Sequence, residues 1–486
     1  MMSGFETLAE LTAALAQRRI SATELLERSI ARIEAFDGRL NAVVVRDFER
    51  ARLAAAAADA ALQRGERRPL LGIPMSVKES YNVAGLPTTW GIPEFAGWCP
   101  AQDAVAVTRL KDAGAVIIGK TNVPYGLGDW QSFNAIYGTT NNPWDLARTP
   151  GGSSGGAAAS LAAGYVPLEI GSDIGGSLRA PAHYCGVFSH KPSRGALPSR
   201  GHVPPGTLGG TPDLSVIGPL ARSAADVSAA FDILAGPDEA EAVAFRLTFP
   251  PPRHDALRDF RVLALDSHPL LPASKSVRTA CGSLVKRLRA AGAAVALDSP
   301  LLPDLAHAAR VFVRLLLPVI FARQPIERMQ RLAGAAAALA PDDESLGAWR
   351  LRGAVASHRD WLAADGERFE LAQRWRALFR EFDVVLFPPM PTPAFRHDQT
   401  SDENARVIDV DGTPYPYLDQ LVYASLATAP GLPVSVVPIE RSDTGLPIGV
   451  QIIGPYLEDR TTLRFAELME REWGGFAPPP GYENLS

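Results

Sequence analysis

The stretch "AAGYVPLEIGSDIGGSLRAPA", residues 162–182, runs from an apolar segment into a loop of glycine and serine, and then into residues that can begin a helix. The apolar segment predicts a strand that ends near Gly171. Gly175 and Gly176 allow a sharp turn after it, in which successive backbone N–H groups can point into one cavity. Such a cavity can hold an oxyanion, and Ser177 lies beside it.

Strand and helix patterns alternate along the rest of the chain. Apolar runs that predict further strands occur in "LLGIPMSVKES" (70–80), "GAVIIGKT" (114–121), "RVLALD" (261–266), "AAVALD" (293–298), "DVVLFPP" (383–389), "PVSVVPI" (433–439) and "PIGVQIIG" (447–454). Amphipathic segments that predict helices separate them. We therefore predict an α/β fold, an α/β/α sandwich in which helices cover both faces of a large, twisted, mixed β-sheet.

The composition excludes several classes of protein. The 486 residues are 47% hydrophobic and 21% charged, as in ordinary globular proteins. A net charge of −5 argues against nucleic acid or an anionic membrane surface as a partner. Three cysteines form neither a disulfide framework nor a metal motif, and they suit a reducing compartment. Because we find no apolar leader and no membrane-spanning segment, we expect a cytoplasmic protein.

We predict a single domain over residues 1–486. Its motif-rich part covers about 70–235, and a more helical part covers about 300–385. Residues 237–255 resemble a linker, which leaves a surface excursion and a domain boundary both open. Aromatic residues in the helical part either line a pocket or belong to the core, and these are Phe312, Trp349, Trp361 and Trp375.

Three motif matches in this sequence are misleading. "GAVIIGKT" matches the P-loop pattern, but its variable residues predict a buried strand rather than a phosphate-binding loop. "GGSSG" (151–155) matches a nucleophile elbow centred on Ser153, but turn-forming residues and prolines precede it instead of a strand. His183, His190 and His202 lack the spacing of metal ligands. We therefore expect no nucleotide site and no metal site.

The stretch "PGGSSGG" (150–156) is either a flexible linker or part of a reactive site. A serine hydroxyl needs a base within hydrogen-bond reach to act as a nucleophile. Lys78 ends an apolar strand, and burial can populate the neutral amine that a base requires. On these residues alone, an ordinary edge-strand lysine is the alternative.

Lys78, "PGGSSGG" and "GSDIGGSLRAPA" (171–182) together resemble the amidase signature family of serine hydrolases. "GKTNVPYG" (119–126), "CGVFSHKPSRG" (185–195) and "GLPIGVQIIG" (445–454) are similar to further stretches of that family. The resemblance covers nearly the whole chain and is strongest between residues 70 and 235.

The resemblance implies a Ser–cisSer–Lys triad. Ser177 is then the nucleophile, and Ser153, on a cis peptide bond after Gly152, passes the proton to Lys78. The other residues whose roles it implies are Ile174, Gly175, Gly176 and Ser177 as backbone donors to the oxyanion, Leu127 as a substrate contact, and Ser154 and Asp173 as their support.

The activity that the resemblance implies is hydrolysis of a small-molecule carboxylic amide to acid and amine through an acyl-enzyme, with no cofactor. Two alternatives stay open: a glutaminase-type subunit of a tRNA-dependent amidotransferase, and an esterase or carbamate hydrolase. Tyr125 and Thr428 depart from residues common in the family and leave the substrate undefined. The oligomeric state, monomer or homodimer, also stays open.

Overall fold

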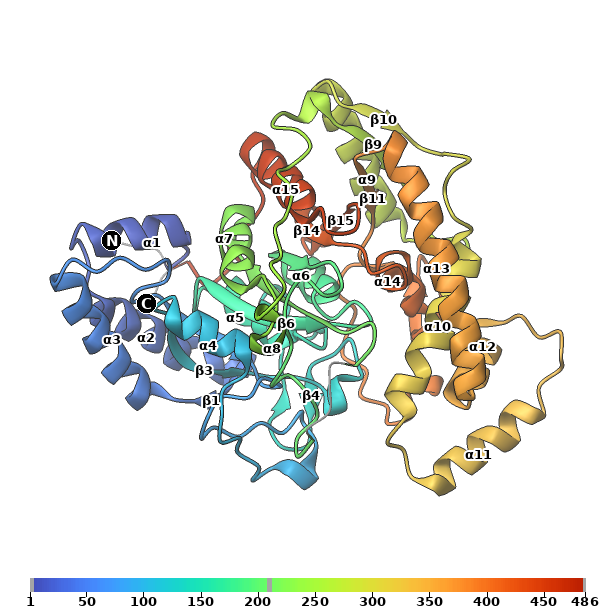
Figure 1. The fold of residues 1–486 in the computed structure, drawn as a ribbon, viewed down its shortest axis with the longest axis horizontal. Helices are drawn as coiled ribbons and strands as arrows, with labels where there is room; N and C mark the ends of the chain where they lie inside the picture. The colour runs from blue at the N-terminus through green and yellow to red at the C-terminus, as the bar shows by residue number, and fades with distance from the viewer. Residues whose placement is uncertain (1–3, 208–211, 484–486) are drawn as a thin grey trace.

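The computed structural model describes residues 4–207 and 212–483. A mixed sheet forms its centre (Figure 1). It has 11 strands in the order β1-β3-β2-β6-β8-β7-β14-β15-β11-β9-β10. The strands are β1 (Val43–Arg46), β2 (Pro74–Lys78), β3 (Val116–Thr121), β6 (Leu168–Asp173), β7 (Phe188–Lys191), β8 (Val216–Ala221), β9 (Arg261–Ala264), β10 (Ala294–Ala296), β11 (Val384–Phe387), β14 (Val434–Arg441) and β15 (Pro447–Ile453). Two short hairpins lie outside it: β4 (Phe133–Asn134) with β5 (Gly138–Thr139), and β12 (Val407–Val410) with β13 (Thr413–Pro416).

Parallel and antiparallel pairs both occur, as predicted. β2 pairs in parallel with β3 and β6, and β9 with β10 and β11. The strands from β6 through β8, β7 and β14 to β15 pair antiparallel. β2, β3, β6 and β8 are buried along their whole length. Burial on both faces explains why their sequences are continuous apolar runs rather than alternating ones.

The helices surround this sheet. They are α1 (Leu8–Ala16), α2 (Ala22–Leu40), α3 (Phe48–Gln63), α4 (Val105–Asp112), α5 (Gly155–Ala162), α6 (Arg179–Cys185), α7 (Ala224–Leu234), α8 (Glu239–Ala242), α9 (Lys275–Ala290), α10 (Leu305–Phe321), α11 (Ile326–Ala337), α12 (Leu346–Ala354), α13 (His358–Glu381), α14 (Leu421–Thr428) and α15 (Asp459–Trp473). Helix starts follow local chemistry. At α2, Ser21 Oγ accepts from the Glu24 N–H and the Glu24 carboxylate accepts from the Ser21 N–H.

Helices cover both faces of the sheet. Adjacent residues of a strand point to opposite faces. On β7, Ser189 Oγ donates to the Leu178 carbonyl beside α6, whereas the next residue, His190, contacts Asp459 at the start of α15. The α/β/α architecture predicted from the sequence is therefore confirmed.

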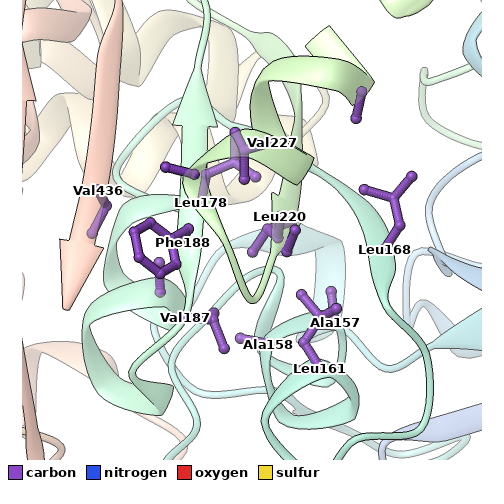
Figure 2. Close-up of a cluster of buried hydrophobic side chains, with 14 of the residues drawn as sticks. Ala157, Ala158, Leu161, Leu168, Leu178, Val187, Phe188, Leu220, Val227 and Val436 are labelled. Atoms are coloured by element: carbon purple, nitrogen blue, oxygen red, sulfur yellow. The ribbon is translucent and has the colours of Figure 1, made fainter. Parts of the chain in front are cut away.

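Apolar side chains from neighbouring strands and from helices form the core. Figure 2 shows Leu168, Leu220 and Phe188 of the sheet beside Leu161 of α5 and Val227 of α7. Each is buried, and full burial of such a side chain contributes about 1.5–3 kcal/mol relative to exposure.

A second apolar cluster joins α10, α12 and α13 to α14. Phe312 is fully buried there, and Trp349 and Trp361 pack on it partly buried. Trp375 belongs instead to the main core. Ile174, from the loop after β6, also packs on the second cluster. The helical part of the chain therefore lies against the loop that contains Ser177.

Six residues of "GAVIIGKT", Val116–Thr121, form β3, and the Gly114 and Ala115 N–H groups bond carbonyls at the end of α4, so the stretch does not form a phosphate-binding loop. Lys120 is fully buried, and its Nζ donates hydrogen bonds to the Pro87 carbonyl and to Thr88 Oγ1. Residues 237–255 contain α8 and irregular chain. Within residues 4–207 and 212–483, no helix is long and apolar enough to cross a membrane.

Candidate active site

Lys78 is the last residue of β2, and its side chain is fully buried. Its Nζ donates to Ser153 Oγ at 2.7 Å and to Ser172 Oγ at 2.9 Å. The parallel pairing of β2 with β6, with Met75 opposite Leu168, places the ends of both strands at one edge and so brings Lys78 to Ser172. The structure therefore joins Lys78 to the loop "PGGSSGG".

That loop is not a linker: residues 150–156 are all buried. The Gly152–Ser153 peptide bond is cis, as the resemblance implied. A Cβ added to Gly152 would lie 2.2 Å from the Asp129 carbonyl oxygen, so a neighbouring backbone segment requires glycine here. The close approach fixes where Ser153 lies relative to the strands.

Ser177 lies in the loop between β6 and α6 and is 7% exposed. Its carbonyl accepts from the Ser154 N–H at 3.2 Å, which joins the two glycine-rich loops. In the part of the chain that the structure describes, no hydrogen bond involves the Ser177 hydroxyl. The structure thus joins Lys78 to Ser153 directly, and it joins Ser177 to them through the backbone of Ser154.

The N–H groups around Ser177 are used unequally. Those of Ile174, Gly175 and Ser177 have no acceptor among the described residues. The N–H of Gly176, in contrast, donates to Asp173 Oδ1 at 3.0 Å. Gly176 has a φ of +100°, a backbone conformation that favours glycine and that makes the turn.

Asp173 holds this turn in place. Its carboxylate accepts from the Gly176 and Leu178 N–H groups, each at 3.0 Å, and from the Arg179 guanidinium at 2.9 Å. Arg179 is itself fixed by Thr428 Oγ1 at 2.7 Å. Thr428, at the end of α14, is one of the two positions that differ from residues common in the family, and through Arg179 it supports this turn.

Burial is the main influence on the protonation of Lys78. Burial lowers the pKa of Lys78 to about 7, although the Asp173 carboxylate opposes the shift. Burial would raise the pKa of Asp173, but Arg179 and the Leu178 N–H outweigh it and hold that pKa at about 2. Burial and the charge of Lys78 lower the pKa of His202 to about 3, so this imidazole is neutral near pH 7.

Ser172 is a neighbour of Lys78 that sequence reasoning missed. Its hydroxyl is the second acceptor of the amine, and its carbonyl accepts from Ser154 Oγ at 3.3 Å. It stands in the quoted stretch five positions before Ser177, but only the register of β2 on β6 shows its role. Nothing in the residue pattern signals this register.

Leu127, expected to contact substrate, is partly exposed in a short turn, with a φ of +62°. The residues just after it, in contrast, touch the site directly: Trp130 Nε1 donates to the Gly175 carbonyl at 3.0 Å. Leu127 as a substrate contact therefore stays a prediction.

The histidines do not form a metal site. His183 bonds the Thr392 carbonyl and the Gly449 N–H, whereas His202 bonds Ser80 Oγ. The described residues contain no group of three His, Cys, Asp or Glu side chains that could hold a metal ion.

His190 belongs to a different pattern, a Ser-His-Asp contact. Its Nδ1 lies 3.0 Å from Ser435 Oγ and its Nε2 lies 3.1 Å from Asp459 Oδ1. Ser435 lies in the middle of the sheet on β14, paired on both sides, so no turn presents free N–H groups to it. Ser435 is thus a buried structural serine and a useful control.

Comparison with known proteins gives the same family as the motifs. The family model "Amidase" matches residues 24–463. A glutamyl-tRNA(Gln) amidotransferase subunit of Anaeromyxobacter sp. (strain K) is 33% identical over 502 residues, covering 97% of each chain. The putative amidase AmiB2 of Mycobacterium bovis is 35% identical over 480 residues, covering 96% of each.

Solved structures agree. A bacterial aryl acylamidase of the amidase signature family superposes with a TM-score of 0.79 at 25% identity, over 97% of this chain and 96% of that one. The fold, the motifs and these matches lead to one conclusion: the chain belongs to the amidase signature family and is an amidohydrolase.

Proposed function

We propose that this protein hydrolyses an uncharged carboxylic amide through an acyl-enzyme on Ser177. The observation that carries the proposal is the 2.7 Å hydrogen bond between Lys78 Nζ and Ser153 Oγ. This bond joins a buried amine to a serine beside the Ser177 loop. Because the pKa of the amine is about 7, about half of the Lys78 side chains are neutral at pH 7. A neutral amine in this place can accept a proton.

In the first half of the reaction, Ser177 Oγ attacks the amide carbonyl carbon and forms the new C–O bond. Its proton passes to Ser153 Oγ, whose own proton passes to the lone pair of Lys78 Nζ. The carbonyl π electrons move to oxygen, and the oxyanion accepts from the free N–H groups of Ile174, Gly175 and Ser177. The Gly176 N–H is not among these donors, because it already donates to Asp173; the role of Gly176 is to form the turn.

In the second half, the proton returns through Ser153 to the amide nitrogen as the C–N bond breaks, and the amine leaves. Water then attacks the acyl carbon, and Ser153 and Lys78 take its proton. The acyl C–O bond to Ser177 breaks, the proton returns through Ser153 to Ser177 Oγ, and the acid is released. Ser154 and Asp173 support this arrangement. The Ser154 N–H donates to the Ser177 carbonyl and so connects the two loops, and the Asp173 carboxylate accepts from the Gly176 N–H and so holds the turn.

The surroundings of the oxyanion loop favour an uncharged, apolar acyl group. Ile174 and Leu421 pack on the apolar cluster of α10, α12 and α13. Nearby guanidinium groups are already paired, Arg179 with Asp173 and Arg350 with Asp419. A substrate carboxylate would therefore have to displace an existing partner.

Kinetics of variants test this assignment. Ser177→Ala should lower kcat by several orders of magnitude with the folded state intact, measured on a panel of primary amides, anilides and esters. Ser435→Ala is the matched control, because it removes a buried serine that contacts a histidine but lies in a paired strand outside the two glycine-rich loops, and we expect near-wild-type kcat. Wild-type kcat in Ser177→Ala would exclude Ser177 as the nucleophile.

A glutaminase component of a tRNA-dependent amidotransferase is the second candidate. It is favoured by the glutamyl-tRNA(Gln) amidotransferase subunits A among the relatives, which align over as much as 97% of this chain. The purified chain decides between the two. A stand-alone amidase hydrolyses simple amides alone and elutes as a monomer or homodimer. An amidotransferase component needs its partner proteins for full glutaminase activity. The cytoplasmic location belongs to both proposals and is tested by cell fractionation.

A further inference from the structure

The segment 129–131 packs against both loops of the proposed site. A Cβ added to Gly152 would lie only 2.2 Å from the Asp129 carbonyl oxygen, so this segment packs directly against the Gly152–Ser153 peptide. The Trp130 indole N–H donates to the Gly175 carbonyl at 3.0 Å. The Trp130 carbonyl accepts from Thr149 Oγ1 at 3.0 Å, directly before "PGGSSGG". One short segment thus touches the Ser153 loop and the Ser177 loop.

A distant part of the chain holds this segment. The Asp129 carboxylate accepts from Arg406 Nη1 and from the Tyr417 hydroxyl, each at 2.6 Å. The side chains of Asp129 and Arg406 are 4% and 3% exposed. Arg406 Nε also donates to the Thr400 carbonyl at 2.6 Å, which fixes the guanidinium plane.

Two further contacts reinforce the same junction. Gln131 bonds the backbone of Asp398 twice: its Nε2 donates to the carbonyl at 2.6 Å, and its Oε1 accepts from the N–H at 2.9 Å. The Tyr417 ring meets the Trp130 indole edge-on at 5.5 Å. Residues 398–417 therefore hold segment 129–131 by charge, by backbone pairing and by ring contact.

Stability alone is a poor explanation for such a buried ion pair. Removing two charges from water is costly, and well-packed apolar residues often stabilise a fold as much or more. What a fully partnered pair provides is one defined arrangement of the groups around it. The groups around this pair are the two loops that the proposed reaction uses.

We propose that Asp129, Arg406 and Tyr417 form a clamp that positions both loops, with Arg406 acting through Asp129 as a positioning residue. The catalytic consequence rests on the proposed function: when the clamp is lost, Ser177 and its N–H groups shift relative to Ser153. A misplacement of about 1 Å in such a site costs roughly 10²-fold in rate.

The test compares Arg406→Met with Arg253→Met in the full chain. Arg253 pairs with Asp383, whose side chain is 1% exposed and which lies directly before β11, beside Arg261 at the start of β9. The control therefore also removes an arginine from a buried carboxylate. We expect both variants to lower Tm. Only Arg406→Met should speed hydrogen exchange at the hydrogen-bonded amides of the two segments 125–131 and 174–178, by at least about tenfold; these are Leu127, Gln131, Gly176 and Leu178.

The same pair of variants gives the kinetic result. Arg406→Met should lower kcat by roughly 10²-fold with a small change in KM, whereas Arg253→Met should retain kcat well below its Tm. If Arg406→Met does not fold, Tyr417→Phe replaces it, because it removes one hydroxyl and keeps the ring on Trp130. Unchanged exchange in both segments overturns the clamp. A wild-type protein that hydrolyses no amide overturns the proposed function instead, and the exchange data still decide the clamp.

Discussion

The Lys78 amine is buried at the end of β2 among serine hydroxyls, and its protonation should control the rate. With a pKa of about 7, the ammonium predominates below that pH and cannot accept the proton of Ser153. We predict that kcat rises about tenfold per pH unit below about pH 7 and levels off above about pH 8. Initial rates on one good amide between pH 5.5 and 9 test this. A flat profile, or a rate that falls across neutral pH, would contradict Lys78 as the base.

Residue types alone singled out Lys78 and Ser177 as candidates, whereas their roles, and that of Ser153, came from the resemblance to the amidase signature family. Lys78 and Ser177 stand out because a strand end and a double glycine flank them. Ser172 and Arg406 do not, because each reaches the site only through a pairing of distant segments. Arg406 meets Asp129 across 277 positions of sequence, and no local pattern carries that information.

The loop before α5 is packed so closely that it leaves no room for a larger residue at Gly152. In Gly152→Ala, the new Cβ would meet the Asp129 carbonyl at 2.2 Å and the Gln131 nitrogen at 2.8 Å, and both atoms are backbone. We predict that this substitution lowers the free energy of unfolding by about 1–3 kcal/mol. Urea denaturation followed by circular dichroism measures the change.

Gly366→Ala is the control for Gly152→Ala. Gly366 lies inside α13, and an added Cβ there meets nothing within 4 Å. We expect a gain of about 0.5–1 kcal/mol, because alanine loses less backbone entropy in a helix. Equal effects of the two substitutions would refute the close approach at Gly152.

Strands were the elements that the sequence predicted best. "PMSVK" and "VIIGKT" are apolar runs because neighbouring layers bury both of their faces. Their order in the sheet could not be predicted, since β14 and β15 insert between β7 and β11 after a long excursion through the helical part. That order depends on packing between layers rather than on local propensity.

Over the whole molecule, the two ends of the chain share the main core. The N- and C-terminal ends lie close together in Figure 1. Phe5 packs on Phe476 with ring centroids 5.7 Å apart, and Phe36 packs on Tyr482 at 5.1 Å. The sheet also runs unbroken from β1 to β10. We therefore predict one domain that unfolds in one cooperative transition.

Differential scanning calorimetry tests the prediction of a single domain. The calorimetric and van't Hoff enthalpies should agree for the full chain. Two separated transitions would instead favour a boundary within residues 237–255, and limited proteolysis would then cut there first.

The covalent intermediate is the most direct test of the proposed chemistry. Wild-type protein is treated with a fluorophosphonate, digested, and mapped by mass spectrometry, with Ser177→Ala and Ser435→Ala in parallel. We predict one adduct on Ser177, retained in Ser435→Ala and absent from Ser177→Ala. An adduct on Ser153 or Ser435, or labelling that survives Ser177→Ala, would contradict Ser177 as the nucleophile.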